Sequence, residues 1–203
     1  MISAEIKNVS LKFETDPSNF SPNGIDSGTL AMLSAVDFLP NDKVLDMGCG
    51  YGVVGILAAK LIGAGNVTMC DISESAVKQA KINAELNGVP DIDIKISDGF
   101  SEIPDNGFTL ILSNPPYHTD FSVPKHFIEV GFKKLAVGGK MVMVTKRLDW
   151  YKNKLASVFG GVRVREIDGY YVFISEKRGE RVPKKEKTVG KLSKKLRKKQ
   201  RGV

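Results

Sequence analysis

The chain of 203 residues has little of several features that mark whole classes of protein. Its longest apolar stretches, such as residues 53–59, are far shorter than the roughly 18 residues that a membrane-spanning helix needs. Its first residues do not combine a basic segment with an apolar one, so we expect no secretory signal. Its two cysteines, Cys49 and Cys70, are too few for a disulfide framework or a zinc cluster. We therefore expect a cytoplasmic protein without a metal site.

Acidic residues are scarce at the end of the chain. Residues 177–203 contain 13 lysines and arginines but two acids, whereas residues 1–176 contain 17 basic residues against 21 acids. The positive formal net charge of +7 therefore originates in this tail. Because the tail has too few apolar residues to bury a core, we expect it to be disordered and to bind the phosphates of RNA. No lipidation motif accompanies it, which favours RNA over a membrane.

The spacing of apolar residues predicts the secondary structure. Alternation over residues 2–13 predicts a hairpin, and the polar segment 15–28 predicts a loop. Expected helices span residues 29–38, 53–62, 73–86, 124–135 and 148–159, and Gly138-Gly139 is expected to end the fourth. Expected strands span residues 43–47, 67–70, 92–96, 108–112 and 141–145, followed by a hairpin of 162–167 and 170–174.

Repeated strand–helix units predict an α/β fold of the Rossmann-like type. We expect a mostly parallel seven-stranded sheet with helices on both faces and an antiparallel hairpin at its C-terminal end. The N-terminal hairpin and loop, residues 1–28, are expected to pack on the main domain, residues 29–176. The basic tail, residues 177–203, is expected to form the third part of the chain.

Unusual residues follow the predicted strands at the point where each strand ends. They are the glycine-rich turn 48–52, Asp71, Asp98 and the segment 114–117. Parallel α/β sheets bind ligands at the carboxyl ends of their strands. One crevice is therefore expected to contain all four groups.

The turn after the first strand of the main domain has glycines at positions 48, 50 and 52, which let a ligand approach the backbone closely. Their spacing differs from the dinucleotide fingerprint, and no lysine follows as in a P-loop. Asp71, at the tip of the next strand, suits a pair of ribose hydroxyls. A purely structural turn and an NAD site are the alternatives at this point.

The most specific motif is Asn114-Pro115-Pro116-Tyr117. Prolines fix φ and lack N–H donors, so this backbone is rigid and presents carbonyl acceptors. Asn114 adds an amide oxygen, and Tyr117 adds a ring. The set suits a planar group with an NH₂, because its two hydrogens need two acceptors. A proline-rich turn after a strand is the alternative interpretation.

Residues 44–56 with Asp71, Asp98 and the Asn-Pro-Pro-Tyr motif resemble a class I S-adenosylmethionine-dependent methyltransferase that modifies amino groups. Phe20-Ser21, the segment 26–29 (Asp-Ser-Gly-Thr) and His118 make the chain similar, more narrowly, to the methyltransferase small domain family. Within that family it resembles the small-subunit ribosomal RNA guanine-N2 methyltransferases of the C type. The resemblance covers about residues 11 to 176 and does not include the basic tail.

The resemblance implies S-adenosylmethionine as the cofactor, with S-adenosylhomocysteine as its product. It implies that the three turn glycines face the methionine part, that Asp46 positions the turn and that Asp71 binds the ribose. It implies that the adenine is held by Asp98 and by the backbone of Gly99 and Phe100. The implied cofactor-binding residues are Asp46, Gly48, Gly50, Gly52, Asp71, Asp98, Gly99 and Phe100. The implied catalytic residues are Asn114, Pro115, Pro116 and Tyr117.

In this interpretation Asn114 and the Pro115 carbonyl accept hydrogen bonds from the target amine, and Tyr117 stacks on its base. Catalysis is then mainly orientation and electrostatics. The expected reaction is methylation of an exocyclic base amine in RNA, guanine N2 of small-subunit rRNA. The alternatives are methylation of adenine N6 in tRNA or DNA, methylation of a protein glutamine amide, and a cofactor-binding ribosome-assembly protein without catalysis.

Overall fold

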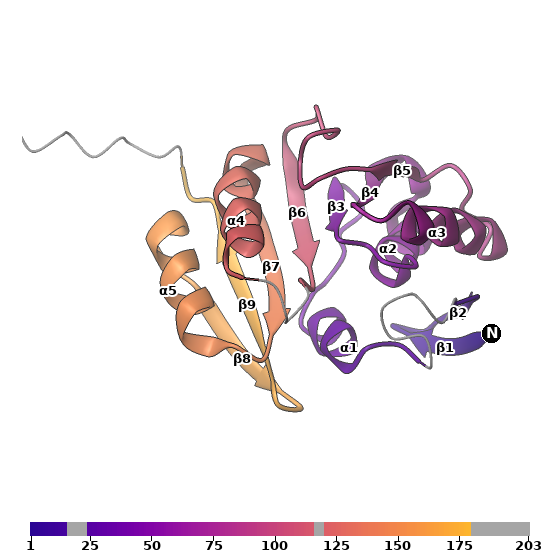
Figure 1. Cartoon of the computed structure of the whole chain (residues 1–203), viewed down its shortest axis with the longest axis horizontal. Helices are drawn as coiled ribbons and strands as arrows, with labels where there is room; N and C mark the ends of the chain where they lie inside the picture. The colour runs from indigo at the N-terminus through magenta and orange to yellow at the C-terminus, as the bar shows by residue number, and fades with distance from the viewer. Residues whose placement is uncertain (16–23, 116–119, 180–203) are drawn as a thin grey trace, which may run out of the picture.

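The computed structural model describes residues 1–15, 24–115 and 120–179, which form a seven-stranded sheet, a two-stranded sheet and five α-helices (Figure 1). In spatial order the larger sheet contains β5 (Asp93–Ile96), β4 (Val67–Asp71), β3 (Val44–Met47), β6 (Phe108–Ser113), β7 (Leu135–Thr145), β9 (Tyr170–Glu176) and β8 (Arg163–Ile167). The first five strands are mutually parallel, and β9 is antiparallel to both of its neighbours. The predicted sheet is therefore confirmed.

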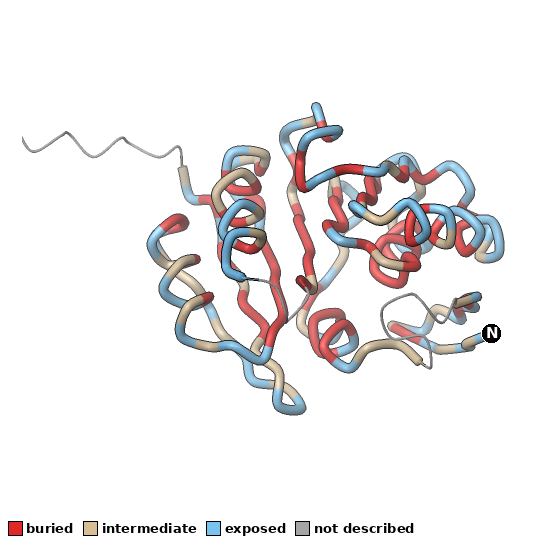
Figure 2. Tube along the Cα trace, viewed as in Figure 1, coloured by how far each residue is buried: buried red, intermediate tan, exposed pale blue. Residues whose placement is uncertain are grey.

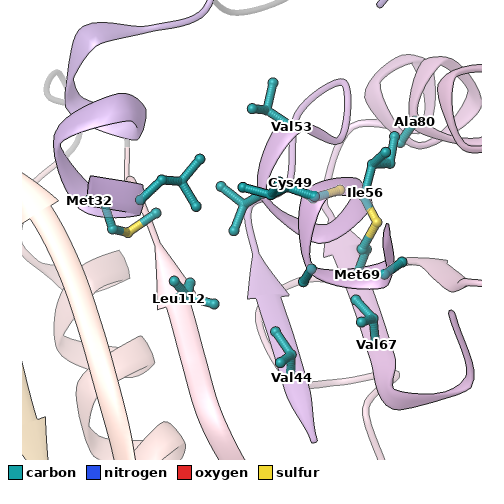
Figure 3. Packing of buried hydrophobic residues seen from close by; sticks show 14 of the residues in the cluster. Met32, Val44, Cys49, Val53, Ile56, Val67, Met69, Ala80 and Leu112 are labelled. Atoms are coloured by element: carbon teal, nitrogen blue, oxygen red, sulfur yellow. The ribbon is translucent and has the colours of Figure 1, made fainter. Parts of the chain in front are cut away.

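Helices pack on both faces of this sheet. They are α1 (Ser27–Ser34), α2 (Val53–Ile62), α3 (Glu74–Leu86), α4 (Ser122–Lys134) and α5 (Leu148–Phe159), with a short 3-10 turn η1 (Ala64–Asn66) after α2. Side chains alternate along β3, so that Val44 joins the core with α1, α2 and α3, whereas Leu45 and Met47 join the core with α4 and α5. Figure 2 shows the buried residues along the central strands, and Figure 3 shows part of the first core.

The smaller sheet consists of β1 (Ile2–Ile6) and β2 (Val9–Phe13), joined by a turn in which Lys7 and Asn8 have positive φ. Two-residue hairpin turns favour this left-handed backbone. The hairpin contributes Leu11 and Phe13 to the core that contains α2, and both side chains are fully buried. Its boundary with the main domain at residue 28 stays a prediction.

Asn83 of α3 and Asn87, which caps the C-terminus of this helix, attach the edge of β2 to the helix layer. Asn83 accepts from the Glu14 N–H and donates to the Glu14 and Tyr51 carbonyls, whereas Asn87 accepts from the Lys12 N–H and donates to the Lys12 carbonyl. These side chains satisfy backbone groups that no neighbouring strand reaches. Among the described residues no helix is both long and apolar enough to cross a bilayer.

The expected boundary between the fourth helix and the fifth strand is wrong. The helix ends at Lys134, and β7 begins immediately, passing through Gly138 and Gly139. Instead of breaking the structure, the glycines form an irregular part of the strand: Gly138 has φ +84°, its N–H donates to the Lys177 carbonyl, and Gly139 accepts from the Lys177 N–H. A Cβ on Gly139 would lie 2.8 Å from the Phe108 carbonyl oxygen, so only glycine fits there.

The first helix also differs from its expected bounds of 29–38. It begins at Ser27, because the Asp26 carboxylate caps it by accepting from the Thr29 N–H, and it ends at Ser34. The cap is the usual use of an aspartate before a helix. The loop expected at 15–28 and the tail expected to be disordered fall largely outside the described residues, at 16–23 and 180–203.

Candidate functional site

A cavity of about 400 Å³ lies at the carboxyl ends of β3, β4, β5 and β6. Seven of the residues singled out from the sequence line it, namely Gly48, Gly50, Asp71, Asp98, Gly99, Asn114 and Pro115. The other lining residues are Met47, Cys70, Ile72, Ser97, Val123 and Phe127. The predicted crevice at this edge of the sheet is therefore present, with polar groups from four strand ends on partly apolar walls.

The glycine turn requires glycine for its backbone. Gly48, Gly50 and Gly52 have φ values of +73°, +54° and +103°, all in the region that other residues rarely adopt. A Cβ on Gly48 or Gly50 would meet no atom within 4 Å, so the turn leaves free space on its cavity side. Gly52 does not line the cavity, and a Cβ there would lie 2.8 Å from Ile56 Cδ1. Two of the three glycines thus line the cavity, and the third packs against Ile56.

Asp46 lies beneath this turn and does not line the cavity. Its side chain is 2% exposed, and its Oδ2 accepts from the Gly55 N–H at 2.9 Å. Gly52 occupies the cap position of α2 and has no side chain, so Asp46 supplies the missing cap from β3. Burial raises the pKa of Asp46 to about 7, opposed by this hydrogen bond and reinforced by the charge of Asp71. The geometry agrees with a residue that positions the turn.

Asp71 accepts hydrogen bonds from both the glycine turn and the start of α3. Its Oδ2 accepts from the Gly50 N–H and its Oδ1 accepts from the Ser73 N–H, both at 2.9 Å. Each carboxylate oxygen has two lone pairs, so both retain an acceptor site towards the cavity. A pair of vicinal hydroxyls would fit these remaining sites.

The far end of the cavity is built from the segment after β5. Asp98 is exposed, and Gly99 takes a left-handed backbone with its carbonyl accepting from Ser97 Oγ at 2.9 Å. Phe100 is buried behind the cavity, where its ring packs edge-on against Phe127 at 6.3 Å. It supports the wall through Phe127 and does not line the cavity itself.

Sequence reasoning did not single out several apolar residues of the wall. Ile72 is 69% exposed although it lies beside Asp71, and an apolar residue directly after a strand-end acid was a usable signal. Val123 and Phe127 arrive from α4, whose contact with this cavity no local pattern indicates. Burial raises the pKa of Cys70 to about 12, so its thiol is a neutral wall group.

Asn114 is held in one orientation at the end of β6. Its Nδ2 donates to Asp26 Oδ2 at 2.7 Å and to Thr29 Oγ1 at 3.0 Å. Its Oδ1 is buried and has no hydrogen-bond partner among the described residues. A buried carbonyl oxygen without a partner is costly, and a donor on a ligand would remove that cost. Pro116 and Tyr117, as well as His118, lie outside the described residues.

Aromatic and basic side chains lie at the adjoining strand ends of β7 and β9. We call Phe121, Lys146, Arg147, Trp150 and Tyr170 the rim. Phe121 stacks on Trp150 with ring centroids 4.3 Å apart, the Arg147 guanidinium lies 5.1 Å from the Phe121 ring, and Lys146 Nζ lies 4.8 Å from the Tyr170 ring. Cations near aromatic faces are a common arrangement at nucleic-acid surfaces. In the described part of the chain no group of three or more potential metal ligands occurs.

Relatives of known name match most of this chain. Ribosomal RNA small subunit methyltransferase C of Serratia proteamaculans is 32% identical over 165 residues, which are 79% of this chain and 47% of the relative. The protein of the same name from Pseudomonas putida is 34% identical over 162 residues, which are 77% of this chain and 48% of the relative. The chain thus spans about half the length of the curated relatives it matches.

Solved structures agree with these relatives. The Thermus thermophilus 16S rRNA methyltransferase RsmC, in complex with AdoMet and guanosine, superposes with a TM-score of 0.79 at 25% identity, covering 87% of this chain and 50% of RsmC. TrmN from Thermus thermophilus has a TM-score of 0.66 at 26% identity, covering 77% of this chain and 51% of TrmN. The model of the methyltransferase small domain family matches residues 10–175. With this match and these strand-end residues, the chain belongs to the methyltransferase small domain family.

Proposed function

We propose that this protein transfers a methyl group from S-adenosylmethionine to an exocyclic amine of an RNA base, guanine N2 of small-subunit rRNA. One observation carries the proposal: Asn114, whose buried Oδ1 has no partner among the described residues, lines the same cavity as the glycine turn and Asp71. The cavity therefore combines an acceptor that needs a donor with a cradle that suits a nucleoside.

The residues present fit the cofactor. The free space beside Gly48 and Gly50 accommodates the methionine part, and the two remaining acceptor sites of Asp71 suit the ribose hydroxyls. Asp98 and the Gly99 backbone, with Ile72 and Phe127 in the same cavity lining, suit a planar base with an amino group. When bound, the cofactor supplies a methyl group that its positive sulfur already activates. Asp46 and Phe100 contribute by holding the turn and the wall.

The role of Asn114 follows from the chemistry of the amine. The nitrogen lone pair of an exocyclic NH₂ is delocalised into the ring, which makes it a poor nucleophile. Asn114 Oδ1 and the Pro115 carbonyl would each accept one N–H and turn the lone pair out of the ring plane. Orientation and two fixed acceptors then supply the catalysis, with Pro116 keeping the backbone rigid and Tyr117 stacking on the base. The nitrogen loses its proton to water after transfer, so no side chain is needed as a general base.

RNA is the substrate that the surroundings of the site favour. Lys146 and Arg147 follow β7, the parallel neighbour of β6, so they place positive charge at the same edge of the sheet as the cavity, and the rim aromatics suit unstacked bases. The tail of residues 177–203 would add phosphate contacts that give affinity without base choice. Guanine N2 and the small subunit are inferred from the named relatives and from RsmC, which was solved with guanosine. Such a substrate implies a cytoplasmic location.

A pair of asparagine substitutions tests the proposal. We expect Asn114→Ala to reduce methyl transfer to rRNA at least a hundredfold while S-adenosylmethionine affinity, measured by calorimetry, stays within twofold, because roughly 2.7–4 kcal/mol depends on such a polar group. Asn106→Ala, at an exposed asparagine outside the cavity, is the matched control. Near-normal turnover of Asn114→Ala would refute amine methylation at this site. Loss of cofactor binding would show that Asn114 contacts the cofactor and not the target amine.

A further inference from the structure

We propose that Asp26 and Thr29 are positioning residues that fix the side-chain amide of Asn114, so that the site accepts a hydrogen-bond donor and rejects an acceptor. The inference rests on the proposed function and adds to it the feature that selects an amine. Neither residue lines the cavity, and both act through Asn114.

The contacts form a closed network. Asp26 Oδ2 accepts from Asn114 Nδ2 at 2.7 Å and from the Thr29 N–H at 2.9 Å. Thr29 Oγ1 accepts from Asn114 Nδ2 at 3.0 Å and donates to Asp26 Oδ2 at 3.5 Å. Both hydrogens of the Asn114 amide are thereby assigned to acceptors from the start of α1. Its oxygen is left as the one polar atom of the amide without a partner among the described residues, and Asn114 lines the cavity.

Packing keeps the network in place. Thr29 is 8% exposed, and Asp26 precedes Gly28, which fits closely against β9. A Cβ on Gly28 would lie 2.8 Å from Tyr170 Cε1 and 2.9 Å from Asp26 Oδ2. The Asp26 carboxylate therefore has little room to turn away from Asn114. The two residues are 88 positions apart in the sequence, and their hydrogen bond joins the start of α1 to the end of β6.

Elementary hydrogen-bond chemistry gives the consequence. An ionised carboxylate only accepts, so the NH₂ end of the amide must face Asp26 and the oxygen end must face the cavity. Rotation of the amide by half a turn would oppose two acceptors at Asp26 and turn the NH₂ towards the substrate. Such an NH₂ would repel the hydrogens of an amine and bind a carbonyl oxygen instead. The negative charge at Asp26 also polarises the amide and strengthens Oδ1 as an acceptor.

This role is separable from helix capping. Asp26 caps α1, so its truncation to alanine would disturb the helix as well as the amide. Serine also caps helices, but its shorter side chain does not reach Asn114. Thr29→Val removes the hydroxyl at nearly constant shape, and with it a 3.5 Å contact to Asp26, but keeps the Thr29 N–H that the Asp26 carboxylate caps. Ser34→Ala removes another hydroxyl of the same helix, one that bonds only to the Ala31 carbonyl, and is the control.

The experiment measures kcat and KM for rRNA methylation with the full-length chain, together with S-adenosylmethionine affinity and melting temperature. We expect Asp26→Ser to lower kcat roughly ten- to a hundredfold, the effect of losing one hydrogen bond to a charged group. We expect Thr29→Val to lower kcat several-fold and Thr29→Ser to recover it. Cofactor affinity stays within about twofold in every variant, since no cofactor contact changes.

The outcomes separate this inference from the proposed function. If the wild-type chain methylates a base amine while Asp26→Ser and Thr29→Val keep its kcat, the positioning role is overturned and the function stands. If the wild-type chain methylates no base amine, the proposed function fails first. If Asp26→Ser unfolds, Thr29→Val with its serine counterpart decides: recovery of kcat by the hydroxyl supports the role, and equal rates overturn it.

Discussion

Asp46 makes the free energy of unfolding depend on pH, and comparison with Asp46→Asn isolates this contribution. Burial raises its pKa from 3.8 to about 7 in the folded chain, and only the lower value applies after unfolding. At 2% exposure, solvent screening does not reduce the effect. The difference between the two values corresponds to about 4 kcal/mol, an order-of-magnitude figure. Asp46→Asn removes the charge and keeps an oxygen that accepts from the Gly55 N–H.

The sign follows from proton binding. Between pH 4 and pH 7 the folded state holds the Asp46 proton and the unfolded state has released it. Wherever the folded state binds more protons, the free energy of unfolding falls as pH rises. The wild-type chain therefore loses stability relative to Asp46→Asn across this window, by up to about 4 kcal/mol, and the difference levels off above pH 8.

Urea denaturation of the two proteins at intervals from pH 4 to pH 8 measures this difference. Carboxylates that do not interact with Asp46 titrate equally in both proteins and cancel in the comparison. Asp91→Asn, at an exposed aspartate, is the control, and we expect its difference from the wild type to be constant with pH. A difference that is also constant with pH for Asp46→Asn would refute the claim that ionisation of the buried Asp46 destabilises the folded chain.

Two further predictions concern cofactor binding and RNA affinity. Asp71→Ala is expected to weaken S-adenosylmethionine binding by roughly 1.5–3 kcal/mol in calorimetry, because it removes the proposed ribose acceptor and releases the Gly50 N–H; unchanged affinity would place the ribose elsewhere. Deletion of residues 180–203 leaves intact Lys177, which is 3% exposed and hydrogen-bonded to the Leu135 carbonyl, so we expect unchanged folding and cofactor affinity. Filter binding at several salt concentrations should show weaker RNA binding with a flatter salt dependence, whereas full-length affinity and slope would exclude the tail from binding.

Much of the fold was predictable because the period of apolar residues is a local property of the chain. Strands such as β4 and helices such as α3 were placed within a few residues on that basis. The start of β7 was not predictable, because Gly138-Gly139 resembles a break until Lys177 pairs with it from the far end of β9. A pair of glycines is compatible with the end of a helix and with an irregular strand. Here the backbone hydrogen bonds to Lys177, which is distant in the sequence, select the strand.

The site likewise contains residues that the sequence predicted and a long-range contact that it did not. Gly48, Asp71 and Asn114 were found because parallel strands end at one edge of a sheet, so that a topological rule brings them together. The contact between Asp26 and Asn114 was missed, although the segment 26–29 contributed to the family resemblance. It joins a helix start to a strand end across the sequence, and no pattern within one segment reports such a contact.

Identification of the methylated nucleoside tests the central claim most directly. Small-subunit rRNA from cells that lack the gene is incubated with the full-length chain and isotopically labelled S-adenosylmethionine, then digested to nucleosides and analysed by mass spectrometry. We expect label in N2-methylguanosine, at a level that Asn114→Ala reduces at least a hundredfold, since roughly 2.7–4 kcal/mol depends on such a group. Label in N6-methyladenosine would assign the same chemistry to adenine N6, and label on a ring carbon or a ribose oxygen would contradict methylation of a base amine.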